Sequence, residues 1–286
     1  MLTSLVVSVA VAGAALAGDQ PVPSGMVVLD SSANGALSMV GNSTVQIPAR
    51  AVYVNSSSTK AVSTTGSAVL DAPYLYVVGG ASFNGSSKCT GQVINSVAPY
   101  VDPYAGRQFP DTSGMADLGG RHITTSVTLQ PGYYSGGIRI SGNAAVTLQP
   151  GLYVVGGDGL RLSSGSISGE GVCIAIYSGS LDIAGSSGVT LTPPADGPFA
   201  GITIAQPSFN TEEMKLAGGS EVDISGAIYA PRAMLTMVGN STVEGTGPQM
   251  GDVVVAGRVT MKGTSIIRIG EPGAPPLKLP TAATYD

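Results

Sequence analysis

The sequence predicts an all-β protein: a single-stranded right-handed parallel β-helix, or β-solenoid, that follows an N-terminal apolar segment. Two observations predict it. An eleven-residue pattern recurs along the chain, and its apolar positions are repeated from copy to copy. We expect the right hand because crossovers between parallel strands almost always have it.

The recurring pattern reads apolar, any, apolar, any, Gly, three small or polar residues, aliphatic, any, apolar. It is plainest in the heptapeptide MVGNSTV, which occurs at residues 39–45 and again at 237–243. Apolar residues two apart predict a strand, and the Gly-Asn or Gly-Ser pair predicts a tight corner before a second strand. Clear copies start at residues 37, 138, 181, 214, 235 and 259, and weaker copies start at residues 62 and 160.

The spacing of the copies predicts that they stack. From residue 138 onward most copies are 21 to 24 residues apart, which is the length of one solenoid coil. A coil cannot bury its apolar positions alone, so neighbouring coils must enclose a common core. Helical repeats need a longer period and a 3.6-residue periodicity. We therefore expect both heptapeptides at equivalent corners of different coils, with one structural corner ladder made by Asn42, Asn143 and Asn240.

The chain divides into three predicted parts. Residues 1–18 are an apolar signal or anchor segment without a charged side chain, residues 19–270 are the β-helix, and residues 271–286 are a Pro-rich tail. Insertions are expected at about 84–122 and 206–213. The first segment is compatible with a cleaved signal peptide, a retained anchor or packing helix, or a core segment. The first two alternatives place the remaining chain outside the cytoplasm, as an extracellular or cell-surface protein.

Composition excludes some classes of function. Only 11% of residues are charged, the net charge is −5, and the 13 Lys and Arg residues form no basic run, which argues against a nucleic-acid partner. Cys89 and Cys173 are a candidate disulfide of an oxidising compartment, or else two separate thiols. No spacing of Cys or His predicts a metal, and no motif predicts a cofactor.

The outward second position of the pattern carries the row Arg139, Arg161, Asp182, Lys215, Thr236 and Thr260. This row has two interpretations: a saccharide groove like that of polysaccharide lyases, or a solvated ladder in which Arg161 and Asp182 pair across adjacent coils. Asp223, Glu244 and Arg268 form a second such row. His122 is the single histidine of the chain. We expect no enzyme, because these side chains do not predict a converging acid and base.

The first predicted insertion differs from the rest of the chain because it concentrates aromatic and charged residues. Loops of this kind on a rigid scaffold often bind ligands. The alternative is a flap that covers one face of the solenoid. The candidate binding residues are Tyr100, Asp102, Tyr104, Arg107, Phe109 and Asp111.

The segments GNSTV, SGNAAVTLQPGLYVVGG and AVYVNSSSTKAVSTTGSAVL, with VDPYAG between them, resemble the repetitive region of TadG-like proteins associated with bacterial Flp (tight-adherence) pili. The similarity covers roughly residues 33–270. It implies an exported, membrane-linked role at the surface or in a pilus, with no defined catalytic site. The basic residues that precede the apolar segment in typical members are absent, and nothing resembles the von Willebrand-type domain of some members.

The expected function is therefore that of an exported non-enzymatic structural or adhesive protein, surface- or pilus-associated, such as a filament subunit. Its expected partners are further copies of itself, other surface proteins or glycans, and a membrane through residues 1–18. A polysaccharide-binding or polysaccharide-degrading solenoid is the alternative, and an ice-binding protein is a third one.

Overall fold

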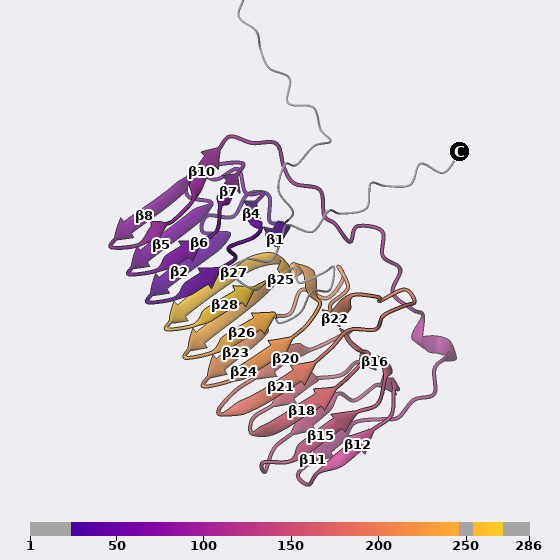
Figure 1. Cartoon of the computed structure of the whole chain (residues 1–286). Helices are drawn as coiled ribbons and strands as arrows, with labels where there is room; N and C mark the ends of the chain where they lie inside the picture. Colours follow the sequence, from indigo (N-terminus) through magenta and orange to yellow (C-terminus); the bar gives the residue numbers. More distant parts are fainter. Residues whose placement is uncertain (1–23, 246–253, 271–286) are drawn as a thin grey trace, which may run out of the picture.

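The computed structural model describes residues 24–245 and 254–270, and the predicted segments 1–18 and 271–286 lie outside them. The described residues form ten stacked coils of parallel strands (Figure 1), which confirms the predicted β-solenoid. One short 3-10 helix, η1 (Thr112–Gly114), is the helical element of this part of the chain. Each coil contributes strands to three faces, which we number in chain order.

Face 1 is built from parallel strands whose spatial order is, from one end of the stack to the other, β10 (Gln92–Asn95), β7 (Tyr74–Val77), β4 (Ala51–Val54), β1 (Ser24–Val28), the first part of β27 (Val254–Gly263), the first part of β25 (Ala227–Gly239), β22 (Ile202–Ala205), β19 (Val172–Ile176), β16 (Gly151–Val155) and β13 (Gly132–Tyr134).

Face 2 has, in the same direction, β8 (Ala81–Gly85), β5 (Val62–Gly66), β2 (Leu37–Gly41), the second parts of β27 and β25, β23 (Met214–Gly218), β20 (Ser180–Ile183), β17 (Gly159–Leu162), β14 (Ile138–Ile140) and β11 (Arg121–Ile123).

Face 3 has, again in that direction, β9 (Lys88–Cys89), β6 (Val69–Asp71), β3 (Thr44–Gln46), β28 (Ile266–Ile269), β26 (Thr242–Gly245), β24 (Glu221–Ile224), β21 (Ser187–Leu191), β18 (Gly165–Gly169), β15 (Ala145–Leu148) and β12 (Val127–Leu129).

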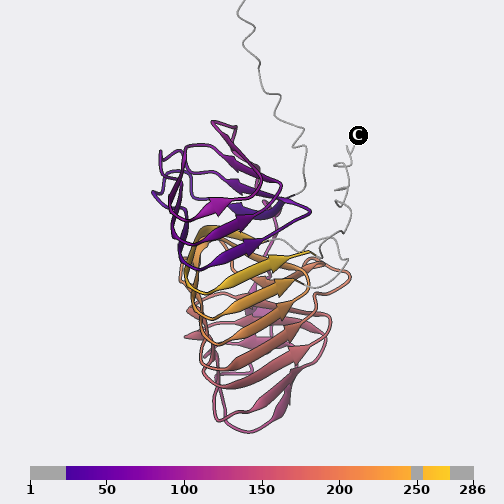
Figure 2. The same cartoon turned by 60° about the vertical axis from the view of Figure 1, so that its left-hand side comes forward.

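The order of the coils in space is not their order in the chain. Residues 24–95, the N-terminal module, form the coils at one end of the stack, and residues 121–270, the C-terminal module, form the others (Figures 1 and 2). The last strands of the chain, β27 and β28, pair with the first ones, β1, β2 and β3. We call this junction the seam. The stack is therefore a continuous solenoid if it is followed from residue 121 to 270 and then from 24 to 95.

The seam explains the two copies of the heptapeptide. Met39 pairs in register with Met261, and Met261 pairs on its other side with Met237. The two copies are thus almost two hundred residues apart in the chain but only two coils apart in space. They occupy equivalent corners, as predicted. All three methionine side chains are fully buried.

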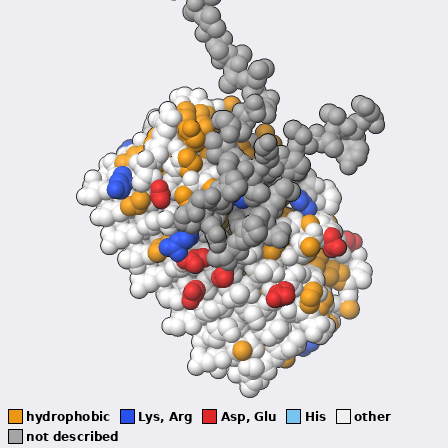
Figure 3. All heavy atoms as spheres, viewed as in Figure 1, with side chains coloured by type: hydrophobic (Ala, Val, Ile, Leu, Met, Phe, Trp, Pro, Cys, Tyr) orange, Lys and Arg blue, Asp and Glu red, His pale blue; other side chains and the backbone are white. Residues whose placement is uncertain are grey.

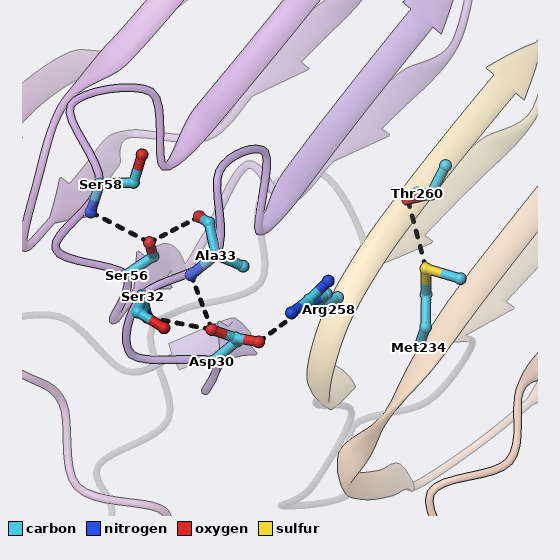
Figure 4. A network of polar contacts seen from close by, with 8 residues as sticks. All are labelled: Asp30, Ser32, Ala33, Ser56, Ser58, Met234, Arg258 and Thr260. Carbon is cyan, nitrogen blue, oxygen red and sulfur yellow. Dashed lines mark hydrogen bonds and ion pairs between the residues drawn. The ribbon is translucent and has the colours of Figure 1, made fainter.

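The seam also carries contacts outside the core. The backbone N–H groups of Leu29 and Asp30 donate to the carbonyl oxygens of Ala256 and Gly257, at 2.8 and 2.9 Å. Arg258 Nε donates to Asp30 Oδ2 at 2.7 Å across the seam (Figure 4). Partial burial opposes ionisation of Asp30, but hydrogen bonds from the Ser32 and Ala33 N–H groups and the Arg258 guanidinium outweigh it and lower the pKa of this carboxyl.

The corners between faces 2 and 3 require glycine. Gly41 has φ +87°, a left-handed conformation that other L-residues rarely adopt. A Cβ atom on this residue would lie 2.9 Å from the carbonyl oxygen of Gly263 in the next coil. Gly239 has the same conformation, with φ +81°. The glycine of the repeat is therefore needed both for the turn and for the close approach of adjacent coils.

The predicted insertion at 84–122 is too long. Residues 81–95 form a complete coil, β8 to β10, in which Gly85 takes the corner position and Phe83 and Cys89 pack against the core. Their copy of the pattern, ASFNGSSKC, is hard to recognise because its apolar residues are few. Of this predicted insertion, residues 96–120 lie outside the coil strands, apart from one parallel bridge between Asp117 and Tyr133. The second predicted insertion, 206–213, joins β22 to β23 without forming a strand.

Candidate functional site

Residues 96–120 form a strap that runs along face 1 from one end of the stack to the other (Figure 1). It leaves β10, contacts the outer side of face 1, and reaches the far end, where the Leu118 N–H donates to the Tyr133 carbonyl at 2.7 Å. A second apolar cluster, separate from the core of the stack, lies beneath it. Middle strands of face 1, such as β4, β19 and β22, are therefore buried on both sides, between the core and the strap.

The aromatic residues of the strap contact aromatic residues of face 1. Tyr100 stacks on Tyr53 with ring centroids 4.1 Å apart, and Tyr104 meets Tyr229 edge-on at 5.3 Å. Phe109 makes a similar contact with Phe199 at 5.4 Å. Aromatic pairs of this kind add about 0.5–1.5 kcal/mol beyond the area that they bury.

The polar candidates of the strap also bond to the stack or to the strap itself. Asp102 accepts a hydrogen bond from the Tyr229 hydroxyl at 3.0 Å, and Arg107 donates to the Pro198 carbonyl. Asp111 caps η1 by accepting from the Ser113 N–H at 2.9 Å. Together with the ring contacts, this arrangement matches the covering flap, the second of the two interpretations offered for these six residues.

Burial under the strap changes the acidity of the tyrosines there. Desolvation, with a smaller effect of the Asp111 charge, raises the pKa of Tyr177 to about 12. Its hydroxyl donates to the Pro110 carbonyl at 2.5 Å. Desolvation also raises the pKa of Tyr229, and the neighbouring Asp102 raises it further. Both hydroxyls therefore stay protonated as hydrogen-bond donors that attach the strap.

The candidate disulfide is not formed. Cys89 lies on face 3 in the coil farthest from the C-terminal module, whereas Cys173 lies on face 1 in β19, beneath the strap. Several coils at about 4.8 Å each separate them, while a disulfide needs Cα atoms within about 7 Å. The two residues are separate thiols, and burial raises the pKa of Cys173.

The predicted row on face 2 is present and in register. His122 pairs with Arg139, Arg139 with Arg161, Arg161 with Asp182, and Asp182 with Lys215. The row continues through Thr236 and Thr260. Neither Arg161 nor Asp182 forms an ion pair with a described residue, so the expected pair between them is not formed. An exposed pair gains too little energy to hold two flexible side chains together.

The row on face 3 has two different halves. Asp223, Glu244 and Arg268 follow one another in register, Arg268 bonds to Glu244, and its Nε donates to Gln46 at 2.9 Å. The coils beyond Asp223 continue the row with exposed hydroxyl side chains, which are Thr190, Ser168, Thr147 and Thr128. In the view of Figure 3, most of the coil surface is neither charged nor hydrophobic.

The three predicted corner asparagines occupy equivalent places but are not neighbours. Asn42 and Asn240 follow the paired corner glycines, with Thr264 in the coil between them. Asn143 lies four coils away from Asn240, in the coil of β14, and its own backbone is left-handed, with φ +58°. The asparagines are therefore separate corner residues rather than a continuous ladder.

A hollow of about 460 Å³ lies beside face 1. Its lining is mainly Pro, Gly and apolar residues, including Pro150, Leu152 and Phe199, with Asp196 as its carboxylate.

His122 is exposed on face 2, with Nε2 3.4 Å from Ser141 Oγ. In the described part of the chain, no group of three or more His, Cys, Asp or Glu side chains is placed to hold a metal ion.

Comparison with known proteins adds no family: no protein-family model matches the chain, and no curated protein matches it significantly. Among the residues that the structure describes, none belongs to a helix long and apolar enough to span a membrane.

Proposed function

We propose that the protein is an exported, non-catalytic structural or adhesive solenoid of a cell surface. Three features support the proposal. They are the apolar segment 1–18, the resemblance to TadG-like pilus-associated proteins, and a continuous stack that presents outward side chains in register from coil to coil. The continuous stack of the two joined modules is the observation on which the proposal rests.

The stack behaves as one body because its two modules are joined in two places. The seam joins them by backbone pairing on all three faces, and the strap joins them along face 1 through aromatic contacts. Such a body resists bending and holds its outward rows at a constant spacing of about 4.8 Å per coil. Weak contacts repeated at constant spacing add up when they bind one extended partner or surface.

The position of the described chain ends suits a protein that is attached from its side. Residue 24 begins β1 and residue 269 ends β28, and both strands belong to coils at the seam. An anchor in the preceding apolar segment would therefore hold the stack near the junction of the two modules. Faces 2 and 3 and both ends of the stack would remain available to partners.

The proposal is tested by the location of the protein on the cells that produce it. Antibodies raised against the purified full chain should label intact cells as strongly as permeabilised ones, and a deletion strain should attach less firmly to surfaces until the gene is restored. Labelling that requires permeabilisation would overturn the surface location. Unchanged attachment of the deletion strain would overturn the adhesive role.

Ice binding is a second candidate function, favoured by the exposed hydroxyl row of face 3, in which Thr128, Thr147 and Ser168 lie on successive coils. A flat row of this kind can contact a repeating solid surface. The full chain should then show thermal hysteresis that Thr147→Tyr abolishes, while Thr59→Tyr, in an exposed loop, leaves it intact. Absence of hysteresis in the unchanged protein would exclude this function.

A further inference from the structure

One end of face 2 carries a column of charged side chains along the stack axis. Its members follow one another in register on successive coils and point outward, and they are His122, Arg139, Arg161, Asp182 and Lys215. Asp182 is half-buried and the others are exposed. We call this set the charged column. Adjacent members are about 4.8 Å apart at the backbone.

The charged column does not serve the fold. Like charges that face each other on adjacent strands destabilise a sheet, and Arg139 lies directly beside Arg161. Neither arginine has an ion pair with any residue that the structure describes, and Asp182, the next member, does not pair with Arg161. Lys215, on the other side of Asp182, does not pair with it either, so the opposite charges that do lie next to each other in the column form no ion pair.

The column is also unusual for the whole molecule. The net charge of the chain is −5, whereas neighbouring Arg139 and Arg161 make the electrostatic potential locally positive. On the coils of His122, Arg139 and Arg161, the next outward residue follows the end of the strand and carries a hydroxyl group: Thr124, Ser141 and Ser163. On the next two coils the equivalent residues are Ala184 and Ala217. The result is a strip in which His122, Arg139 and Arg161 run beside three hydroxyl residues on the same coils, and Asp182 and Lys215 continue the column.

We propose that this strip binds a linear acidic polysaccharide, lying along the stack axis with carboxylates against Arg139 and Arg161. The guanidinium group binds carboxylates through two parallel hydrogen bonds. The hydroxyl line matches sugar hydroxyl groups, which donate and accept hydrogen bonds as serine and threonine do. A polymer with one carboxylate in each sugar unit can place charges against successive coils. The inference rests on the proposed adhesive function and names its ligand.

A single-stranded nucleic acid is the main rival among linear polyanions. Proteins that bind such strands combine cations with aromatic side chains on which the bases stack. The ring pairs Tyr53–Tyr100, Tyr104–Tyr229 and Phe109–Phe199 lie between face 1 and the strap instead. Apart from the His122 imidazole, the charged column and its hydroxyl neighbours contain no ring.

The test uses the purified full chain and polygalacturonate as the probe, in binding titrations at rising salt. Neutral dextran and a thymidine oligonucleotide serve as competing probes. We expect binding to polygalacturonate alone, weakening as salt screens the exposed charges. The variant Arg139→Gln/Arg161→Gln should lose about tenfold or more in affinity, because it removes two groups that form charge-assisted hydrogen bonds.

The matched control is Lys60→Gln/Lys88→Gln, which lowers the positive charge by the same amount but leaves the column intact. It should bind polygalacturonate as the unchanged protein does. Neither double variant should have a lower thermal midpoint than the parent, which shows that the stack is intact; relief of the Arg139–Arg161 repulsion can only raise the midpoint. Equal losses in the two variants, equal binding of dextran, or preference for the oligonucleotide would overturn the inference. Because binding is measured on purified protein, its failure is distinguishable from failure of the surface location.

Discussion

The seam and the junction next to it allow a direct comparison of two coil interfaces. Between β25 and β27 the two coils follow each other in the chain, whereas between β27 and β2 they are more than two hundred residues apart. Nevertheless both junctions pair parallel strands in the same register. Both place Met261 against the methionine of a MVGNSTV heptapeptide, Met237 on one side and Met39 on the other.

The likeness of the two junctions teaches that chain connectivity does not determine the stacking. Backbone hydrogen bonds, the buried aliphatic positions and the corner glycines are the same in both, so the interface energy should be the same as well. The difference lies in what holds the coils in place. Adjacent coils of one module are joined by the chain itself, while the modules are joined covalently through the strap alone.

The largest expected effect comes from truncating the two equivalent methionines. Met39→Ala and Met237→Ala should each lower the free energy of unfolding by about 2–5 kcal/mol, because each leaves a cavity in the core. If the seam equals an ordinary junction, the two losses should agree closely in urea unfolding. A clearly smaller loss for Met39→Ala would show that the seam is the looser interface.

Alanine at the corner glycines should have the next largest effect. Gly41→Ala and Gly239→Ala both place a Cβ at positive φ and close to a carbonyl of the next coil, at 2.9 and 3.1 Å. We expect a cost of about 1–3 kcal/mol for each in thermal or urea unfolding. Gly114→Ala, with open space around it, is the control and should change little. If Gly41→Ala left the stability unchanged while Gly239→Ala lowered it, the seam would be packed less tightly than an ordinary junction.

The ion pair of the seam should contribute less. Asp30→Asn should cost at most about 1 kcal/mol, since the Arg258 side chain is half exposed. The folded-state pKa of Asp30 is lowered, so its contribution is present above the ordinary carboxyl pKa and is lost as the pH falls through the lowered value. Urea midpoints of the variant and parent should therefore converge in acid.

The smallest expected change is that produced by cutting the strap. A protease site placed at Gly106, which is exposed and has open space around it, would separate the modules covalently. The two fragments should still elute as one species of the original size, because the seam pairs all three faces. Their unfolding should then depend on protein concentration. Fragments that separate without denaturant would show that the strap, rather than the seam, holds the modules together.

The coil repeat could be predicted from the sequence because stacking requires apolar residues at the same inward positions, and a tight corner at the same place, in every coil. The order of the coils could not. Each edge of a coil presents the same backbone groups and the same kinds of side chain, so Met39 fits against Met261 as well as Met237 does. A pattern that makes coils interchangeable cannot say which of them are neighbours.

The covered side of face 1 had a signal that the repeat pattern does not use. Strands β19, VCIAI, and β22, ITIA, are buried along their whole length, with no alternation of polar residues. Continuous apolar runs are typical of strands buried on both faces. Combined with the aromatic residues of the strap, they favour covering over ligand binding. The missing Arg161–Asp182 pair had no signal, because register alone does not decide the conformation of exposed side chains.

The seam also has a consequence for how the protein is made. Strands β1 to β3 emerge first during synthesis, but β27 and β28, their partners on one side, emerge last. At about 5–20 residues per second, the N-terminal module waits on the order of tens of seconds with one open sheet edge. Such an edge is a template for wrong pairing. Closing the stack is therefore a late and slow step, because it pairs strands far apart in the sequence. Until then the open edge needs protection from wrong partners.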